Sequence, residues 1–148
     1  MAGYVQVIKI SRKDIPDVLV LLKKILGDID DAATLNILNS RMESPYFLYL
    51  YARLDGEPVG IVEVQFRKEI LLSGPREYGY IPMLYVMPEA RRKGVASRLL
   101  QVAQIWLKNN GAKEMWAMSG PQQEGLNPFL GKSGLVPNQA KFVKDLTQ

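Results

Sequence analysis

The chain has 148 residues, 47% of them hydrophobic and 23% charged, which fits a single domain over residues 1–148 with an ordinary hydrophobic core. It contains no cysteine and no histidine, so disulfides, thiolate nucleophiles, imidazole bases and ordinary zinc sites are excluded, and no metal centre is expected. The net charge of +4 suits an anionic ligand, but without a basic stripe it argues against nucleic acid as a partner.

The beginning of the chain predicts a strand followed by a helix. Residues 4–10 alternate apolar and polar side chains, which is typical of a strand. Residues 11–27 predict a helix, because Ser11 and Asp14 can form a capping box at its start and Gly27 can end it. The start of the chain has no basic-then-apolar signal pattern, and no apolar run approaches the roughly 20 residues that span a membrane, so we expect a cytoplasmic protein with no membrane partner.

The middle of the chain predicts a weak helix and a hairpin. A helix over about 31–41 has few apolar residues, so we expect an exposed and loosely packed element. Residues 46–66 predict a hairpin, since two β-rich runs flank Asp55-Gly56, a strong hairpin signal. Residues 67–77 are polar and predict a loop.

The second half predicts a strand, a helix and another strand. Residues 78–87 read as a strand that Pro82 must interrupt, because proline cannot donate a ladder hydrogen bond, and a bulge, a splay or an edge is expected there. Residues 95–111 predict a helix from the spacing of their apolar side chains, and residues 112–119 predict a strand.

The end of the chain predicts a short helix over 127–133 and a final strand near 140–146. Gly131-Lys132-Ser133 looks like the end of a nucleotide-binding P-loop, but the first glycine of that motif would fall at Leu126. The order of elements, β-α-α-β-β-β-α-β-α-β, predicts an α/β protein of the α+β type, with a mostly antiparallel sheet flanked by helices.

The most informative stretch covers residues 83–100, where a strand runs into a basic turn that opens a helix. A helix start leaves backbone N–H groups without partners and carries positive potential, which favours phosphate binding. Gly94 would let the backbone approach an anion closely. Charge around it comes from Arg91, Arg92, Lys93 and Arg98. The alternative is a solvated basic turn before an amphipathic helix.

The spacing R-x-x-G-x-A at Arg91, Gly94 and Ala96 resembles the acetyl-CoA pyrophosphate loop of the GNAT N-acetyltransferase superfamily. Residues 54–64 (LDGEPVGIVEV) look like the hairpin of that family, and residues 127–135 (NPFLGKSGL) are similar to a shortened form of its late motif. The resemblance implies a GNAT-like sheet with a splayed central strand pair, and a direct transfer of acetyl from acetyl-CoA to a primary amine.

The resemblance also implies a set of cofactor-binding residues. The strand before the loop would pair with the pantetheine arm, the loop would hold the pyrophosphate, and the backbone N–H of Val86 would polarise the thioester carbonyl. The implied cofactor-binding residues are Leu84, Tyr85, Val86, Arg91, Arg92, Lys93, Gly94, Val95, Ala96, Ser97 and Asn127.

Two departures from the family pattern concern proton transfer. Family members often carry a tyrosine two residues before the lysine of the late motif, where this chain has Leu130, or Phe129 if the register slips. Many members place a glutamate on the strand before the loop, where this chain has Pro82 and Tyr80. The usual acid and base are therefore both missing.

Other side chains are candidates for these roles. Glu63 lies mid-strand and shares a face with Ile61 and Gln65, so it can activate the amine through water; a carboxylate on the solvent face of a sheet is the alternative. Tyr80 alternates with Tyr78 onto one face and can line the acceptor pocket or relay a proton; strand packing is the alternative.

Weaker candidates lie near the expected acceptor site. Glu77 begins a strand, and Glu43 and Tyr46 precede the hairpin. Trp106 and Trp116 are expected in the core.

The leading hypothesis is an N-acetyltransferase whose acceptor is a small-molecule amine, aminoglycoside-like compounds included, or a peptide amine; the basic net charge mildly disfavours polycations. The second is a non-catalytic acyl-CoA-binding or regulatory module on the same fold. A nucleotide or nucleic-acid binder is disfavoured by the failed P-loop spacing. A homodimer through the final strands is compatible with the family.

Overall fold

The computed structural model of the chain describes residues 3–118, 126–137 and 143–147. The chain divides into two units, residues 1–118 and 119–148, and each is considered by itself. No helix among the described residues is long and apolar enough to cross a membrane. The first unit contains β1 (Val5–Lys9), η1 (Arg12–Asp14), α1 (Ile15–Leu26), α2 (Asp31–Met42), β2 (Phe47–Leu54), β3 (Glu57–Leu71), β4 (Gly74–Val86), η2 (Pro88–Ala90), α3 (Val95–Asn109) and β5 (Glu114–Ala117).

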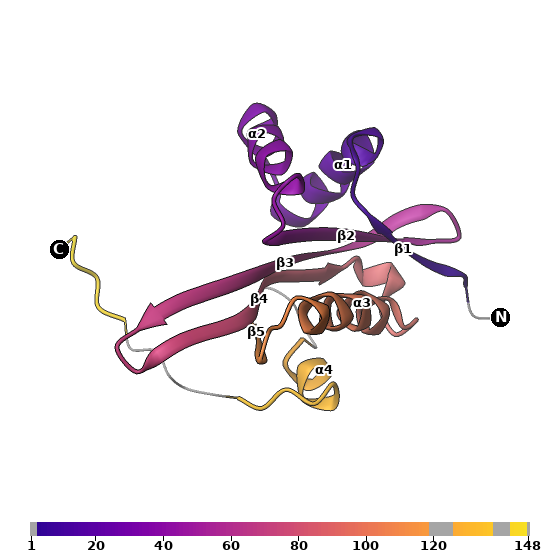
Figure 1. The fold of residues 1–148 in the computed structure, drawn as a ribbon. Helices are drawn as coiled ribbons and strands as arrows, with labels where there is room; N and C mark the ends of the chain where they lie inside the picture. Colours follow the sequence, from indigo (N-terminus) through magenta and orange to yellow (C-terminus); the bar gives the residue numbers. More distant parts are fainter. Residues whose placement is uncertain (1–2, 119–125, 138–142, 148) are drawn as a thin grey trace. The chain divides into compact units, whose positions relative to one another are not determined.

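A single sheet with the strand order β1-β2-β3-β4-β5 forms the centre of the first unit. Neighbouring strands are antiparallel, except that β4 and β5 are parallel. Helices α1 and α2 cover one face of the sheet, and α3 covers the opposite face (Figure 1). These are called the α1/α2 face and the α3 face below. The predicted fold class, a mostly antiparallel sheet flanked by helices, is confirmed.

The hairpin between β2 and β3 turns at the predicted pair. Asp55 has a φ of 51° and Gly56 a φ of 86°, and a two-residue turn of this kind needs positive φ at both positions. Asparagine, aspartate and glycine adopt this conformation most readily, which explains why Asp55-Gly56 predicted the turn correctly.

The predicted loop over residues 67–77 is wrong. Strand β3 continues to Leu71 and β4 begins at Gly74, so the two strands form a second long hairpin (Figure 1). Its outer part is held by cross-strand pairs of charged residues, such as Lys68 and Glu77, whose Nζ and Oε1 atoms are 3.4 Å apart. An exposed hairpin with alternating charges has the same polar composition as a loop, so composition alone predicted a loop for these residues.

A β-bulge interrupts β4 at the predicted place. Glu63 of β3 is paired with Met83, whereas Gln65 is paired with Tyr80, so two residues of β4, Ile81 and Pro82, lie opposite one residue of β3. The parallel ladder between β4 and β5 also ends here in the described part of the chain, at Ile81, whose carbonyl accepts a hydrogen bond of 3.0 Å from the Met118 N–H.

The hydrophobic core lies on both faces of the sheet. On the α1/α2 face, one cluster contains Ile10, Val18, Leu21, Leu22, Leu38, Tyr49, Tyr51 and Ile61. Helix α3 buries Val95, Leu99, Leu100, Ala103 and Leu107. A Cβ at Gly79 would collide with the Leu107 side chain, so glycine at this position permits the close approach of α3 to β4. Val102 and Trp106 share the apolar spacing that predicted this helix, but they are only half-buried, although Trp106 was expected in the core.

The second unit contains α4 (Leu126–Lys132), which agrees with the predicted short helix. Gly134, with a φ of 92°, follows it, and the Ser133 hydroxyl donates a hydrogen bond of 2.9 Å to the Phe129 carbonyl. Gly131-Lys132-Ser133 therefore belongs to a helix end. The predicted final strand is absent from residues 143–147, and the rest of it, residues 140–142, lies outside the described residues.

Asp14 connects the start of α1 to the sheet. As the capping box predicts, its Oδ2 atom accepts hydrogen bonds from the Ser11 N–H at 3.0 Å and the Ser11 hydroxyl at 2.8 Å. Its Oδ1 atom accepts a 2.8 Å hydrogen bond from the Tyr51 hydroxyl. Burial acts to raise the pKa of Asp14, but these hydrogen bonds outweigh it, so the pKa lies below the ordinary value of 3.8.

Asp14→Asn is expected to lower the free energy of unfolding by about 1–3 kcal/mol at neutral pH, because it weakens hydrogen bonds to a buried charged group. A carboxylate with a lowered pKa stabilises the fold above pH 3.8 and loses this contribution as the pH falls through its folded pKa. The variant should therefore lose less stability than the wild type on acidification, as measured by urea unfolding between about pH 2 and 7.

Asp17→Asn is the matched control, since the exposed Asp17 carboxylate makes only a surface ion pair with Arg53, at 2.9 Å. It should cost at most about 1 kcal/mol. Equal losses in the two variants would contradict the role assigned to Asp14.

Candidate functional site

The turn between β4 and α3, residues Arg91–Gly94, has an unusual backbone. Arg92 has a φ of 63° and Gly94 a φ of 81°, both in the left-handed region. A non-glycine residue in this region costs about 1–2 kcal/mol, and such residues cluster at ligand-binding sites. A Cβ at Gly94 would meet no atom within 4 Å, so open space surrounds this position. The positive φ favours glycine at this position, and its backbone borders open space. This segment is called the α3 turn below.

The α3 turn exposes the N-terminal end of α3. Gly94 is the N-cap of the helix, no side chain of the described residues caps it, and its first turn carries no acidic residue. Arg92, Lys93 and Arg98 are exposed around it. Backbone N–H groups and the positive end of the helix dipole thus face open space, and three exposed cations lie within a few residues of Gly94, which makes this end of α3 suited to a phosphate group.

The other predicted cofactor-binding residues divide into two groups. Leu84, Val86 and Val95 have buried side chains, so only their backbones can contact a ligand. Arg91 is turned back onto β4, where its Nε atom donates a 3.1 Å hydrogen bond to the Val86 carbonyl and its guanidinium lies 5.7 Å from the centre of the Tyr85 ring.

Ala96 is half-buried and Ser97 is exposed in the first turn of α3. Asn127 lies in α4, and its side chain lies outside what the structure describes.

The end of β4 directs alternate backbone groups to its two edges. The Met87 N–H donates a 2.7 Å hydrogen bond to the Val59 carbonyl of β3. Backbone groups alternate along a strand, so the N–H and C=O of Val86 point toward the opposite edge of β4. The hydrogen bond from Arg91 to the Val86 carbonyl agrees with this direction. Val86 therefore presents its backbone on the β5 side of β4, beyond the bulge.

Glu63 forms the centre of a hydrogen-bond network on the α1/α2 face. Its Oε2 atom accepts hydrogen bonds from Arg41 Nη1 at 2.9 Å, the Tyr49 hydroxyl at 2.8 Å and Gln65 Nε2 at 3.0 Å. Its side chain is only 14% exposed, which rules out the alternative of a solvated carboxylate. Among the described residues, Oε1 has no hydrogen-bond partner. Glu63, Arg41, Tyr49 and Gln65 are called the carboxylate network below.

The carboxylate network also connects α2 to the sheet. Arg41 belongs to α2, its guanidinium lies 4.8 Å from the centre of the Phe47 ring, and its Nη1 atom donates a 3.1 Å hydrogen bond to the Tyr49 hydroxyl. Burial raises the pKa of Tyr49, the hydrogen bond to Glu63 raises it further and Arg41 opposes the change. Tyr49 therefore remains a neutral donor toward Glu63 at physiological pH.

A patch of aromatic and guanidinium groups continues the same face beyond Gln65. Arg67 lies 4.0 Å from the centre of the Tyr80 ring, and Tyr80 is paired with Trp116 of β5. The Trp116 ring stacks on Tyr78 with 4.1 Å between centroids. Trp116 is 40% exposed, so its predicted place in the core is wrong. Its described ring contacts are with Tyr78 and Arg76 of the neighbouring strand β4, and none is with a helix.

The weaker candidates lie outside the carboxylate network. Glu77 pairs with Lys68, Glu43 makes an exposed ion pair with Arg12 at 3.3 Å, and Tyr46 stacks on Phe66. Within the described ranges, no group of three or more acidic residues is arranged to hold a metal ion. The described contacts of these three side chains are thus separate from those of Glu63.

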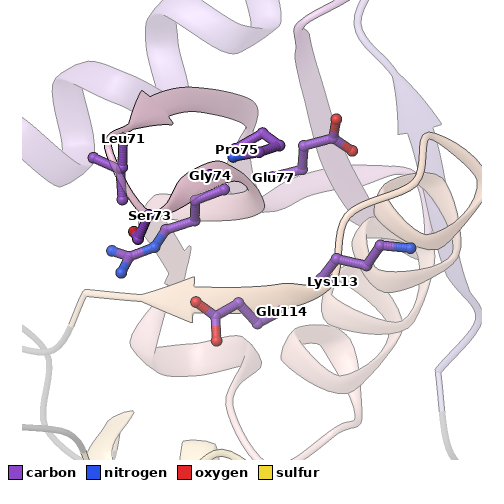
Figure 2. A pocket seen from close by; sticks show the side chains of 8 residues that line it. Leu71, Ser73, Gly74, Pro75, Glu77, Lys113 and Glu114 are labelled. Atoms are coloured by element: carbon purple, nitrogen blue, oxygen red, sulfur yellow. The ribbon is translucent and has the colours of Figure 1, made fainter.

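A hollow of about 230 Å³ opens where the outer end of the β3–β4 hairpin meets the start of β5 (Figure 2). Its lining consists of Leu71, Ser73, Gly74, Pro75, Arg76, Glu77, Lys113 and Glu114. Two cations and two acids balance one another there, and no residue of the α3 turn or the carboxylate network takes part. The hollow is thus separate from the candidate site.

Sequence reasoning missed three side chains that organise this face: Arg41, Tyr49 and Arg67. Tyr49 is paired with Glu63 across β2 and β3, but the register extended from the Asp55-Gly56 turn would place Tyr49 opposite Val62, because the pairing shifts by one residue between Ala52 and Arg53. Arg67 was assigned to a loop. Arg41 reaches the sheet from another element, and no local signal predicts that contact.

Comparison with known proteins gives a consistent result. Residues 18–134 match the family described as "Acetyltransferase (GNAT) family". The chain is 29% identical to an aminoglycoside N(6′)-acetyltransferase type 1 of Acinetobacter haemolyticus over 105 residues, 70% of this chain and 72% of the relative. It is 30% identical to the enzyme of the same name from Stenotrophomonas maltophilia over 91 residues, 60% of this chain and 58% of the relative.

A solved structure shares the fold along nearly the whole chain. The structure of AAC(6′)-Iy in complex with a bisubstrate analogue, CoA-S-monomethyl-acetylneamine, superposes with a TM-score of 0.83 at 18% identity. The match covers 97% of this chain and 99% of the other. At this identity, the likeness shows a common fold.

Arg41→Ala is expected to loosen α2, because Leu38 is the one fully buried side chain of this helix, Met42 is only partly buried against the core, and Arg41 adds hydrogen bonds to the sheet. Loss of charge-assisted hydrogen bonds should speed amide hydrogen exchange in residues 31–42 about tenfold to a hundredfold, as measured by mass spectrometry.

Arg12→Ala removes a neighbouring ion pair whose side chains are 80% and 77% exposed, so exchange in α2 should change by no more than a few-fold. If both variants accelerated exchange equally, Arg41 would not be the anchor of α2.

Proposed function

Because this chain belongs to the acetyltransferase (GNAT) family, it is an acetyl-CoA-dependent N-acetyltransferase, and we propose that its acceptor is a small molecule with a primary amino group. One observation carries the proposal: strand β4 connects the α3 turn at its end with the carboxylate network beside its bulge. A donor held at the α3 turn and an amine held at Glu63 would then meet along one strand.

The donor site uses the backbone more than side chains. We propose that the N–H groups of residues 92–97 hold the pyrophosphate, with Arg92, Lys93 and Arg98 adding charge. The edge of β4 over residues 84–86 would pair with the pantetheine arm. Asn127, in the second unit, is proposed as a cofactor contact from its place in the late motif alone. The family match spans both structural units, which supports one functional domain over the whole chain.

In the reaction, the amine nitrogen attacks the thioester carbon, so a C–N bond forms, the C–S bond breaks and the amine loses a proton. We propose that the Val86 N–H polarises the thioester oxygen. Glu63 Oε1 receives the amine proton, directly or through water, while three donors hold Oε2 in place. The Tyr80 hydroxyl, which has no hydrogen-bond partner in the described part of the chain, protonates the leaving thiolate.

The names of the two relatives point to aminoglycosides as their acceptors. In this chain, the face that carries Glu63 is open beyond α2, where Trp116 and Tyr80 lie. Aromatic side chains beside one placed carboxylate are the kind of lining found at sites for small molecules, here one that bears an amine.

Gly94→Glu is expected to weaken acetyl-CoA binding at least a hundredfold in calorimetry, because the carboxylate would occupy the phosphate space and repel it. Gly27→Glu is a stringent control: Gly27 has a φ of 80°, close to the 81° of Gly94, its ψ of −144° makes a non-glycine residue there the more strained of the two, and a Cβ also meets nothing within 4 Å. It follows α1, on the opposite face of the sheet from α3 (Figure 1). Undiminished binding by Gly94→Glu would remove the α3 turn from the donor site.

Glu63→Gln is expected to lower kcat about 10²- to 10⁴-fold with the best amine acceptor, while KM for acetyl-CoA stays near the wild-type value, since only proton transfer is impaired. The assay follows thiol release. Glu69→Gln, on the same face of β3, removes a carboxylate that only accepts a 2.7 Å hydrogen bond from the Tyr78 hydroxyl. It should keep kcat within a few-fold, and an equal loss in both variants would argue against Glu63 as the base.

A further inference from the structure

Three side chains on the α1/α2 face of β3 form a continuous hydrogen-bonded row. Gln65 Nε2 donates to Glu63 Oε2 at 3.0 Å, and Arg67 Nε donates to Gln65 Oε1 at 3.1 Å. Gln65 is buried, and both contacts are part-buried. The row holds a carboxylate at one end and a guanidinium at the other, with one amide between them.

The Arg67 guanidinium is fixed before any ligand arrives. Its Nε atom donates a hydrogen bond to Gln65 Oε1, and its Cζ atom lies 4.0 Å from the centre of the Tyr80 ring. Yet Arg67 is exposed and makes no ion pair with any carboxylate of the described residues. Its remaining Nη N–H groups suit a carboxylate, which guanidinium binds with paired hydrogen bonds.

Glu63, at the other end of the row, offers a hydrogen-bond acceptor instead of donors. The Glu63 Oε2 atom is saturated by three donors, whereas Oε1 has no partner in the described part of the chain. An ammonium or amine group can therefore donate to Oε1 without displacing Arg41. The row thus offers one acceptor for an amino group and, two side chains further along this face of β3, donors for an anion.

The surroundings are less suited to a ligand with many positive charges. The carboxylate of Glu63 is already paired with Arg41, and that of Glu69 accepts from Tyr78. Arg67 and Arg76 lie on the same face, and Arg76 approaches the Trp116 ring at 5.7 Å. Each additional ammonium would meet these cations rather than an open carboxylate.

Given the N-acetyltransferase function proposed above, on which this assignment rests, we propose that the acceptor is a zwitterion of the α-amino-acid type. Its amino group is bound at Glu63 Oε1 and its carboxylate at the Nη groups of Arg67. The exposed ring of Trp116, next to Tyr80, borders the acceptor side chain, so amino acids with apolar or aromatic side chains fit best.

The experiment compares pairs of acceptors that differ only in the carboxylate. Free amino acids are assayed against their amides, for example phenylalanine against phenylalaninamide, with neamine and spermidine as polycations. Because the amide changes the basicity of the amine, kcat/KM is expressed per neutral amine. The wild type should prefer the acid over its amide about tenfold to a hundredfold, as expected for charge-assisted hydrogen bonds.

Variants at Arg67 test the origin of that preference. In Arg67→Gln the ratio of acid to amide should fall to about one, mainly through a higher KM for the acid, and Arg67→Lys should restore part of it. Lys68→Gln, which removes a cation from the opposite face of the same strand, should keep the wild-type ratio.

The possible failures are distinguishable. Equal turnover of acids and amides, or a preference for neamine or spermidine, would overturn the zwitterion assignment and leave the N-acetyltransferase function intact. An acid preference that survives in Arg67→Gln would also overturn it. Acetyl-CoA binding without acetylation of any amine in either set would overturn the proposed function and the assignment with it.

Discussion

The absence of an N–H group at Pro82 is the constraint on which the site depends. A proline inside a paired strand must be accommodated, and here β4 inserts one extra residue opposite Val64. The insertion reverses the alternation of β4. Tyr80 lies with Gln65 on the α1/α2 face, whereas Leu84, an even number of residues later, lies with Val62 on the α3 face. The bulge thereby places the ring of Tyr80 on the α1/α2 face and the side chain of Val86, which is paired with Gly60, on the α3 face.

The carboxylate network shows how a partly buried charge is kept without a metal or a histidine. Desolvation of a carboxylate is costly unless hydrogen bonds replace water, and Glu63 receives a cation, a hydroxyl and an amide on one oxygen. Hydrogen bonds to charged groups contribute about 1.5–3 kcal/mol each, so the three together fix the orientation of the side chain. Fixing one oxygen in this way aims the other toward the open part of the face.

Much of the fold and part of the site could be predicted from local signals. Asp55-Gly56, the capping box of Asp14, the position of Gly94 and the interruption at Pro82 all report conformations that a few residues determine by themselves. The face assignment of Tyr80 and Val86 depended on the register across the bulge, which no local pattern specifies. The contact of Arg41 with Glu63 joins residues of different elements, and the charges of Arg67 and Lys68 looked like those of a loop until their partners on β4 were known.

The weak packing of α2 has a consequence for which substitutions such a protein can tolerate. The helix buries one apolar side chain, Leu38, and most of its surface meets water. Substitutions along α2 therefore leave the main core nearly unchanged. Helix α3, which follows the α3 turn, buries five residues, so substitutions on its buried side would disturb the core. New specificities can accumulate on the α2 side at little cost in folding, and the donor side stays constant while they do.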